Sequence, residues 1–371
     1  MASSRPVQLG VVGSCGRGGA FRKSCNVLDD LHIAAVCDTN EQKLEQSRAD
    51  LGADQAFADY QQMLDITDLD AVLIGTPMPL HAPQAIEALQ RGIHVLSEVP
   101  AAISIEQCCS LVAAVHNSQA IYMMAENCVY LRSTQIIKEL IRQGMFGQPY
   151  YAEGEYLHEL KQLNEVTKWR RQWQTGINGI TYGTHSLGPI LYWMQGDRVA
   201  SVCCRGSGHH HQDPRNQDYE NEDSCVMLAK MVSGSLVQIR VDMLSDRPHG
   251  TNNYHLQGTD GCFESARTPD QCHRLWLRQI DPDKQKWVDL ETLAGDYLPP
   301  VWKRYERLSA AAGHSGTDLL VLVAFLSAVR GESTAEIGIH EAMDMTLPGL
   351  ISQQSIEQDG VWLEVPDSRM W

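Results

Sequence analysis

Two tyrosine–histidine pairs are the residues of this sequence best suited to moving protons. Tyr156 and His158 lie two apart in an extended segment, so their side chains point to one face of a strand. Tyr182 and His185 lie three apart where a helix is expected to begin, which makes them neighbours on one turn. Histidine takes or gives a proton near neutral pH, whereas tyrosine is a poor base unless its surroundings activate it. Taken alone, the first pair could simply cover a sheet and the second could form a satisfied helix start, and for a single pair we favour this structural interpretation.

A glycine-rich turn near the N-terminus is suited to binding a dinucleotide. It follows an apolar run at residues 7–12 and opens a helix, where glycines let the backbone approach a pyrophosphate. The strict G-x-G-x-x-G pattern fails because Cys15 holds its middle position. Asp38 ends the next apolar run, where a carboxylate accepts hydrogen bonds from the ribose hydroxyls and favours NAD over NADP; alternatively, it caps the following helix. The expected cofactor-binding residues here are Gly13, Cys15, Gly16, Arg17, Gly18 and Asp38.

Two further turns follow apolar runs and should lie at the same edge of a parallel sheet. Thr76 and Pro77 come after the third run, with His81 just beyond, and Glu98 and Pro100 come after the fourth. Because ligands bind outside the carboxyl ends of such strands, we expect these five residues on the nicotinamide side of the cofactor. The alternative is a pair of ordinary strand-ending turns.

The elements that must position these residues fall into two parts. Strands are expected at 7–12, 33–37, 71–74, 94–96 and 120–124, with helices at 20–31, 40–51, 82–90 and 106–116. Short apolar runs separated by helices indicate an α/β fold with a doubly wound parallel sheet, of Rossmann type, in residues 1–127. Residues 128–371 contain longer alternating segments at 149–158, 200–205, 225–231, 235–243 and 254–258, which indicate a second α/β domain with a mostly antiparallel sheet.

Composition excludes several classes of protein. The 371 residues are 43% hydrophobic and 20% charged, which excludes a disordered tail or a coiled coil. A net charge of -16 excludes nucleic-acid binding through a basic surface. Apolar stretches are too short for a membrane span, and the first residues lack the apolar region of a secretory signal. We therefore expect a cytoplasmic protein.

Cysteines and clustered histidines show no metal-binding pattern. Eleven cysteines occur without a C-x-x-C pair, as reduced thiols in a core would. The tract from His209 to His211 lies in a polar loop without acids in ligand spacing, so we expect solvent exposure and no metal site. Trp169 and Trp173, four apart, could stack on a sugar ring or pack in the core.

Taken together, these motifs resemble the Gfo/Idh/MocA family of NAD(P)-dependent sugar oxidoreductases. The glycine turn, Asp38, the Thr76-Pro77 turn with His81 and the E-x-P tripeptide occur in the order of that family. The resemblance covers nearly the whole chain. It implies a Rossmann domain followed by a domain, here 128–371, whose open sheet binds substrate and often forms an oligomer contact, so a homodimer or homotetramer is expected.

The sequence is most similar to one branch, the NAD-dependent glycosidases of glycoside hydrolase family 109. Dehydrogenases of the wider family carry a lysine where this chain has Val99, and an aspartate where it has Thr181. Similarity to the glycosidase branch lies in Glu98–Ala102, Met124–Cys128 with Tyr130, Gly147, Tyr156–His158, Tyr182–Pro189, Tyr297 with Pro300 and Trp302, and Gly313–Asp318. The chain departs from the branch at Gly183 and Glu159, where Pro and Asp are usual.

The resemblance implies a glycosidase that holds NAD tightly and recycles it. Such an enzyme oxidises C3 of the sugar, eliminates the aglycone after loss of the C2 proton, adds water and reduces C3 again. By resemblance, His185 serves the C3 hydroxyl, Tyr182 or Tyr156 lies near the C2 proton, and His158 and Glu126 are polar contacts. Asn127 joins the cofactor set, and Tyr297, Trp169, Trp173 and His314 are expected substrate contacts. The alternatives are a net sugar or polyol dehydrogenase and a non-catalytic sugar or nucleotide sensor.

Overall fold

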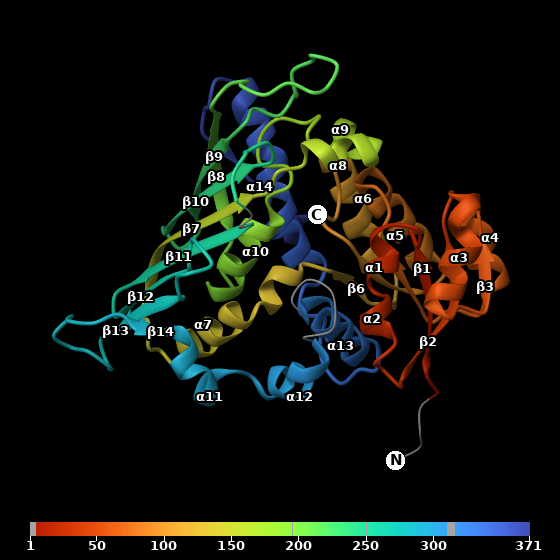
Figure 1. Ribbon diagram of the computed structural model, residues 1–371, viewed down its shortest axis with the longest axis horizontal. Coiled ribbons are helices and arrows are strands. Elements are labelled where there is room, and N and C mark those ends of the chain that lie inside the picture. The colour runs from red at the N-terminus through yellow and green to blue at the C-terminus, as the bar shows by residue number, and fades with distance from the viewer. Residues whose placement is uncertain (1–4, 195, 249–250, 310–315) are drawn as a thin grey trace. The chain divides into compact units, whose positions relative to one another are not determined.

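The chain forms two compact units. The computed structural model describes residues 5–194, 196–248, 251–309 and 316–371 (Figure 1). One unit comprises Met1–Asn127, Arg304–Met343 and Ser368–Trp371, and the other comprises Cys128–Lys303 and Asp344–Asp367. The units do not follow a single cut in the chain, because two late segments belong with the first 127 residues. The substrate-binding and oligomerisation role expected for residues 128–371 stays a prediction.

The first unit contains the expected doubly wound parallel sheet. Its strands are β1 (Val7–Val12), β2 (Leu31–Cys37), β3 (Gln55–Phe57), β4 (Ala71–Ile74), β5 (His94–Ser97) and β6 (Tyr122–Met124). They pair in the order β3-β2-β1-β4-β5-β6, with every pairing parallel. All four residues of β4 are buried, as expected of a strand covered on both faces. The order changes direction between β1 and β4, the point where such sheets bind their ligands.

The helices of this unit differ from expectation in two places. They are α1 (Arg17–Ala20), α2 (Arg22–Cys25), α3 (Glu41–Leu51), α4 (Tyr60–Ile66), α5 (His81–Gln90), α6 (Ile105–His116) and α13 (Thr317–Val329). The helix expected at 20–31 is wrong in extent, because Leu31 already pairs with Val7 as part of β2. The short elements β3 and α4 were not foreseen.

The second unit contains a nine-stranded sheet. Its strands are β7 (Pro149–Leu157), β8 (Val199–Gly206), β9 (Cys225–Met231), β10 (Leu236–Asp242), β11 (Asn252–Gly258), β12 (Gly261–Glu264), β13 (Arg274–Leu277), β14 (Val288–Asp289) and β15 (Leu363–Glu364). The order is β14-β13-β12-β11-β7-β10-β9-β8-β15, and only the β7–β10 pairing among these is parallel. The mostly antiparallel sheet expected from sequence is therefore confirmed.

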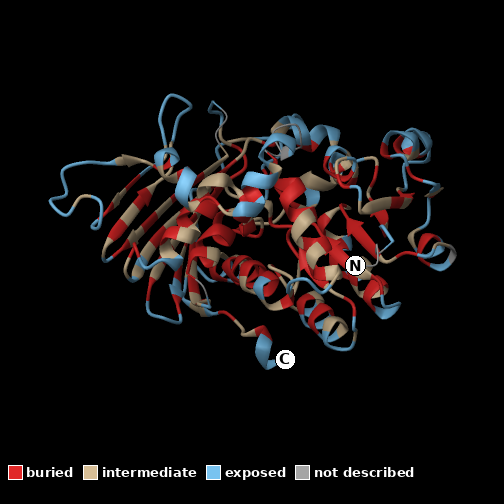
Figure 2. Cartoon of the chain, turned by 90° about the horizontal axis from the view of Figure 1, so that it is seen from below, coloured by how far each residue is buried: buried red, intermediate tan, exposed pale blue. Residues whose placement is uncertain are grey.

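Helix α10 (Thr184–Trp193) covers the central strands of this sheet. It packs against β7, β10 and β11 (Figure 1). The strands alternate between buried and more exposed residues, so one face forms the core (Figure 2). Gly154 of β7 permits the close approach of α10, since a Cβ atom there would lie 2.3 Å from the carbonyl oxygen of Ser186. The helix that carries His185 is thus seated directly on the strand that carries Tyr156.

Further helices complete the second unit. They are α7 (Arg132–Arg142), α8 (Lys161–Val166), α9 (Lys168–Trp173) and α11 (Ala294–Tyr297), while α12 (Pro300–Ser309) and α14 (Ile339–Glu357) have residues in both units. Among the described residues, no helix combines the length and the apolar character that a bilayer span requires.

Candidate active site

The two tyrosine–histidine pairs meet in the second unit. The ring of Tyr156 lies with its centroid 5.3 Å from that of His185, 5.6 Å from that of Tyr182 and 5.5 Å from that of His158. The rings of Tyr182 and His185 are 5.4 Å apart and nearly perpendicular. The Tyr156 hydroxyl oxygen lies 2.7 Å from Nδ1 of His158, within hydrogen-bond distance. These four side chains are named here the Tyr/His cluster.

Two neighbouring elements hold the cluster together. The last two residues of strand β7, Tyr156 and Leu157, are both buried, and His158 follows directly. Helix α10 begins at Thr184, with Gly183 as its N-cap, so His185 lies in the first turn and Tyr182 lies just before the helix. The Tyr254 hydroxyl donates a 2.5 Å hydrogen bond to the backbone carbonyl of His185. The first turn of α10 is therefore fixed to β11.

Burial decides the protonation of Tyr156. Desolvation raises the pKa of this phenol far above its usual value, and Tyr182 raises it further, while His185 and Arg170 lower it. Tyr156 consequently stays protonated at neutral pH and cannot act as a free phenolate. Any transfer of a proton through its oxygen needs an acceptor, and His158 Nδ1 lies at the required distance.

Arg170 is a residue that sequence reasoning missed. It lies on α9 with its guanidinium 4.5 Å from the ring centroid of Trp169, and it donates a 2.7 Å hydrogen bond to Gln174. Its charge acts on Tyr156. The sequence signal that could have revealed it is the pair of adjacent arginines, Arg170 and Arg171, that lies between Trp169 and Trp173.

The expected substrate contacts remain predictions. Trp169 and Trp173 both lie on α9 and are half-buried, and Trp169 packs against Arg170. Tyr297 ends α11 and is also half-buried. His314 lies outside the described residues.

The glycine turn of the first unit has the close backbone packing that a dinucleotide site requires. Gly13 has a φ of +73°, and a Cβ atom there would lie 2.5 Å from the Gly75 carbonyl oxygen. A Cβ atom on Gly18 would lie 2.6 Å from the carbonyl oxygen of Val12. Only glycine therefore fits where the turn meets the end of β4. Gly16 is exposed at this edge, where backbone groups can face a pyrophosphate.

Asp38 is fixed beside this turn. Its two carboxylate oxygens accept hydrogen bonds from the backbone N–H groups of Cys15, at 2.8 Å, and of Asn40, at 2.9 Å. The N-cap of α3 is Asn40. A carboxylate oxygen has more than one acceptor position, so Asp38 can still accept from ribose hydroxyls. The residues present thus fit the adenosine half of NAD.

His81 links the turn after β4, which contains Thr76, to the turn after β5, which contains Pro100. Its ring nitrogens lie 2.8 Å from the carbonyl oxygens of Thr76 and Pro100, and the side chain is almost fully buried. Desolvation lowers the pKa of His81, while these carbonyls and Glu98 raise it. His81 therefore orders both turns; a direct contact of Thr76, Pro77, His81 or Pro100 with cofactor stays a prediction.

Three other predicted residues are built into the packing of the first unit. Glu126 is fully buried just after β6. Asn127 donates a 3.2 Å hydrogen bond to the hydroxyl of Thr317 at the start of α13. Arg17 pairs with carboxylates of Glu98 and Asp318. Their roles toward cofactor or substrate are not decided by these contacts.

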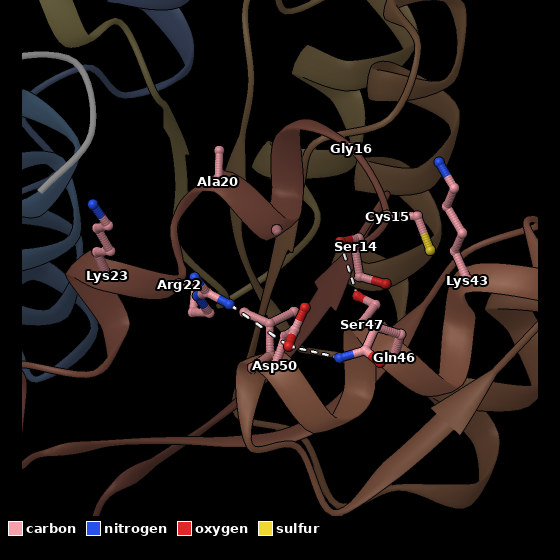
Figure 3. A pocket seen from close by; sticks show the side chains of 12 residues that line it. Ser14, Cys15, Gly16, Ala20, Arg22, Lys23, Lys43, Gln46, Ser47 and Asp50 are labelled. Carbon is pink, nitrogen blue, oxygen red and sulfur yellow. Dashed lines mark hydrogen bonds and ion pairs between the residues drawn. The ribbon is translucent and has the colours of Figure 1, made fainter.

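A cavity of about 570 Å³ lies behind the glycine turn, against α3 (Figure 3). Its lining comprises Ser14, Cys15, Gly16, Gly19, Ala20, Arg22, Lys23, Lys43, Gln46, Ser47, Asp50 and Leu51. Only Cys15 and Gly16 of these were predicted to bind cofactor. The cavity thus extends from the turn along the helices α1 to α3.

The histidine tract has an acidic partner that the sequence did not reveal. Nδ1 atoms of His210 and His211 lie 3.1 and 2.9 Å from one oxygen of Asp223. His209 and His210 are exposed, as expected, while His211 is half-buried. The fold brings Asp223 to them across the polar loop.

Comparison with known proteins identifies the family. Residues 130–370 match the model of the glycosyl hydrolase 109 C-terminal domain, and residues 7–126 match that of the oxidoreductase family with an NAD-binding Rossmann fold. The chain belongs to glycosyl hydrolase family 109. It is 31% identical to a glycosyl hydrolase family 109 protein of Shewanella pealeana, over 97% of this chain and 85% of the relative. It is 29% identical to an alpha-N-acetylgalactosaminidase of Shewanella oneidensis, over 97% and 84% of the two chains.

Solved structures share the fold of this family member. A levoglucosan dehydrogenase in complex with NADH and L-sorbose aligns with a TM-score of 0.84 at 17% identity, covering 98% of this chain and all of the other. The WlbA dehydrogenase of Bordetella pertussis, in complex with NADH and UDP-GlcNAcA, aligns with a TM-score of 0.78 at 21% identity, covering 99% of each. The resemblance to the Gfo/Idh/MocA family and its glycosidase branch is confirmed, and so are the α/β fold and the NAD-binding domain.

Proposed function

We propose that this chain hydrolyses a glycoside with NAD as a recycled cofactor, so that the overall reaction is redox-neutral. The observation that carries the proposal is the Tyr/His cluster, in which four proton-transfer groups adjoin one another and Tyr156 faces His158 at 2.7 Å. Val99 and Thr181 further support it, because they stand where dehydrogenases of the wider family, as the sequence comparison implied, carry a lysine and an aspartate.

Proton transfer at C3 of the sugar would fall to His185. NAD held by the glycine turn and Asp38 would supply the acceptor and, at the end of the same turnover, the donor of the C3 hydride. His185 takes the proton of the C3 hydroxyl during oxidation and gives it back during reduction. Its backbone is anchored by Tyr254, which keeps the imidazole on the first turn of α10.

The resulting C3 ketone acidifies the C2 proton, which the Tyr156–His158 pair would remove. Since burial keeps Tyr156 protonated, its phenol passes its own proton to His158 as its oxygen takes the proton from C2. The bond from C1 to the aglycone oxygen breaks, and we assign Tyr182 as the group that protonates this oxygen. Water then adds its hydroxyl group to C1 and returns a proton to Tyr182. The half-buried His158 exchanges its proton with solvent, and the Tyr156–His158 pair then delivers a solvent-derived proton to C2.

Net sugar oxidation is the second candidate, and the dehydrogenases among the structural neighbours favour it. The two functions differ in one measurable outcome. A dehydrogenase accumulates NADH with free sugars, whereas the proposed glycosidase returns every hydride within its turnover. The homo-oligomeric state and the cytoplasmic location expected from sequence also stay proposals.

A panel of aryl glycosides in deuterated water tests the proposal. Aryl α-N-acetylgalactosaminides are the first choice, because one relative bears that activity in its name. We expect cleavage, deuterium at C2 of the released sugar and almost no NADH. Cleavage without deuterium at C2 would exclude the elimination, and NADH accumulating in proportion to product would favour the dehydrogenase.

The variant His185→Ala tests the assigned base. It should abolish cleavage and leave NAD binding unchanged, whereas His209→Ala, which removes an exposed histidine of the same unit, should retain both. Full cleavage by His185→Ala would refute the role of His185.

A further inference from the structure

The guanidinium of Arg17 is engaged by two carboxylates. Its Nη1 and Nη2 atoms donate a pair of 2.8 Å hydrogen bonds to Asp318, and its Nε atom donates a 2.8 Å hydrogen bond to Glu98. The same guanidinium lies 4.5 Å from the ring centroid of the buried Phe21. A bidentate pair and a third charge-assisted bond fix the plane of this side chain. Its positive charge is balanced within the protein.

Asp318 reaches this cluster from a distant part of the sequence. It lies 301 residues after Arg17, in the first turn of α13, and its side chain is fully buried. A buried carboxylate is costly unless it is paired and hydrogen-bonded, so the Arg17 fork is the reason that Asp318 can occupy this position. Because it is covered by protein, Asp318 cannot itself touch a ligand.

Glu98 stands at the edge of the sheet where ligands bind. It directly follows β5, and its backbone N–H donates a 2.9 Å hydrogen bond to the carbonyl oxygen of Ile74 at the end of β4. Gly75, the next residue, packs backbone to backbone against Gly18 of the glycine turn. About a tenth of the Glu98 side chain and about a fifth of the Arg17 side chain remain exposed, in contrast to Asp318. Glu98 and Arg17 are therefore the members of the cluster that a bound dinucleotide can reach, but the Arg17 guanidinium already donates hydrogen bonds to the two carboxylates.

We propose that Arg17 and Asp318 are positioning residues of the NAD site, which hold the Glu98 carboxylate toward the cofactor, and that the Arg17 side chain is not a phosphate ligand. Asp318 orients the guanidinium, and Nε of the guanidinium orients Glu98. The proposal concerns cofactor binding alone and does not depend on which sugar reaction the enzyme performs.

The variant Asp318→Asn distinguishes the two roles of Arg17 by the sign of its effect. Removing this carboxylate loosens the guanidinium, so we expect NAD to bind about tenfold more weakly to nucleotide-free protein, the effect of one lost charge-assisted hydrogen bond. If Arg17 bound phosphate, removing its buried partner would leave more positive charge for the pyrophosphate and strengthen binding. Unchanged or tighter NAD binding by Asp318→Asn would overturn the proposal.

Three further variants separate positioning from folding. Glu98→Gln should weaken NAD binding by a similar factor. The double variant Asp318→Asn/Glu98→Gln should bind NAD no more weakly than the weaker-binding of the two single variants, because both changes act through one carboxylate. Arg17→Lys keeps the charge beside Asp318 but loses the fork, so it should also bind NAD weakly. If Asp318→Asn does not fold, Glu98→Gln carries the test, because removing this carboxylate would strengthen NAD binding if Arg17 bound phosphate. Asp30→Asn breaks the ion pair with Arg330 in the same unit and should leave NAD affinity unchanged.

Thermal unfolding without NAD provides the second readout. A purely structural cluster predicts a lower melting temperature with unchanged NAD affinity in Arg17→Lys and Glu98→Gln. That result, or strictly additive losses in the double variant, would contradict positioning.

Discussion

The phenol oxygen of Tyr156 lies 2.7 Å from Nδ1 of His158, two residues further along the chain at the end of β7. A raised pKa keeps Tyr156 protonated, so this contact gives the phenol an acceptor for its proton. A buried tyrosine without such an acceptor could bind a substrate but could not relay a proton.

The first prediction therefore concerns His158. Replacing it with alanine should lower the turnover of an aryl glycoside by about 10²-fold, the usual contribution of one general acid–base group, and leave NAD affinity unchanged. Steady-state kinetics over a range of pH provide the measurement. Tyr156→Phe and the double variant Tyr156→Phe/His158→Ala should lose turnover by a similar factor, since both residues act in one relay. If the losses of the two single variants multiply in the double variant, the two residues have separate roles.

Gly154 provides a second prediction, because it seats α10 on β7. In Gly154→Ala the new Cβ atom would meet the Ser186 carbonyl oxygen, so α10 must shift. We expect a loss of about 1–3 kcal/mol in the free energy of unfolding, as for other overpacked sites, together with reduced turnover as His185 moves. Denaturant unfolding and kinetics check this. The control is Gly295→Ala, at a helical glycine with nothing within 4 Å of the added atom, which should be tolerated.

The third prediction is a loss of stability in mild acid. Burial lowers the pKa of His94 and of His273, and Nδ1 of each accepts a backbone hydrogen bond, from Ile121 and Ala266 respectively. Below the ordinary histidine pKa of about 6.5, the unfolded chain binds protons that the folded chain does not, so the free energy of unfolding falls as the pH falls.

Unfolding measured at several pH values tests this loss. His94→Asn and His273→Asn keep an acceptor in place of Nδ1 and remove the titration, so each should flatten the dependence on pH. The exposed residue His209 serves as the control through His209→Asn, which should not change the slope. If neither His94→Asn nor His273→Asn changes the slope of the free energy of unfolding against pH, the loss of stability in acid does not arise from these two histidines.

The fourth prediction concerns the choice of cofactor. Asp38→Ser removes the carboxylate beside the glycine turn, so NAD should bind about tenfold more weakly and the discrimination against NADP should decrease. Titration of nucleotide-free protein with both dinucleotides measures these effects. Asp54→Asn, at an exposed aspartate of the same unit, should leave both affinities unchanged. Discrimination that survives Asp38→Ser would assign specificity to other residues.

Patterns of neighbouring residues were sufficient to predict the parallel and antiparallel sheets and the two tyrosine–histidine pairs. Strand and helix periods are local properties, because the alternation of buried and exposed positions follows directly from backbone geometry. For that reason β7 and the start of α10 could be placed before any long-range contact was known. The extent of the first helix could not, since α2 already ends at Cys25 and Leu31 pairs with Val7 in β2.

Only the tertiary structure decided which side chains share a partner. It placed Asp318 on Arg17 across 301 residues, Arg170 near Tyr156, and the ring of His81 between two carbonyl oxygens. The sequence by itself determined the types of chemical groups and the strands and helices that carry them. Their pairing, burial and protonation depend on packing between segments far apart in the chain, where desolvation and charge compensation arise, and no local pattern records these.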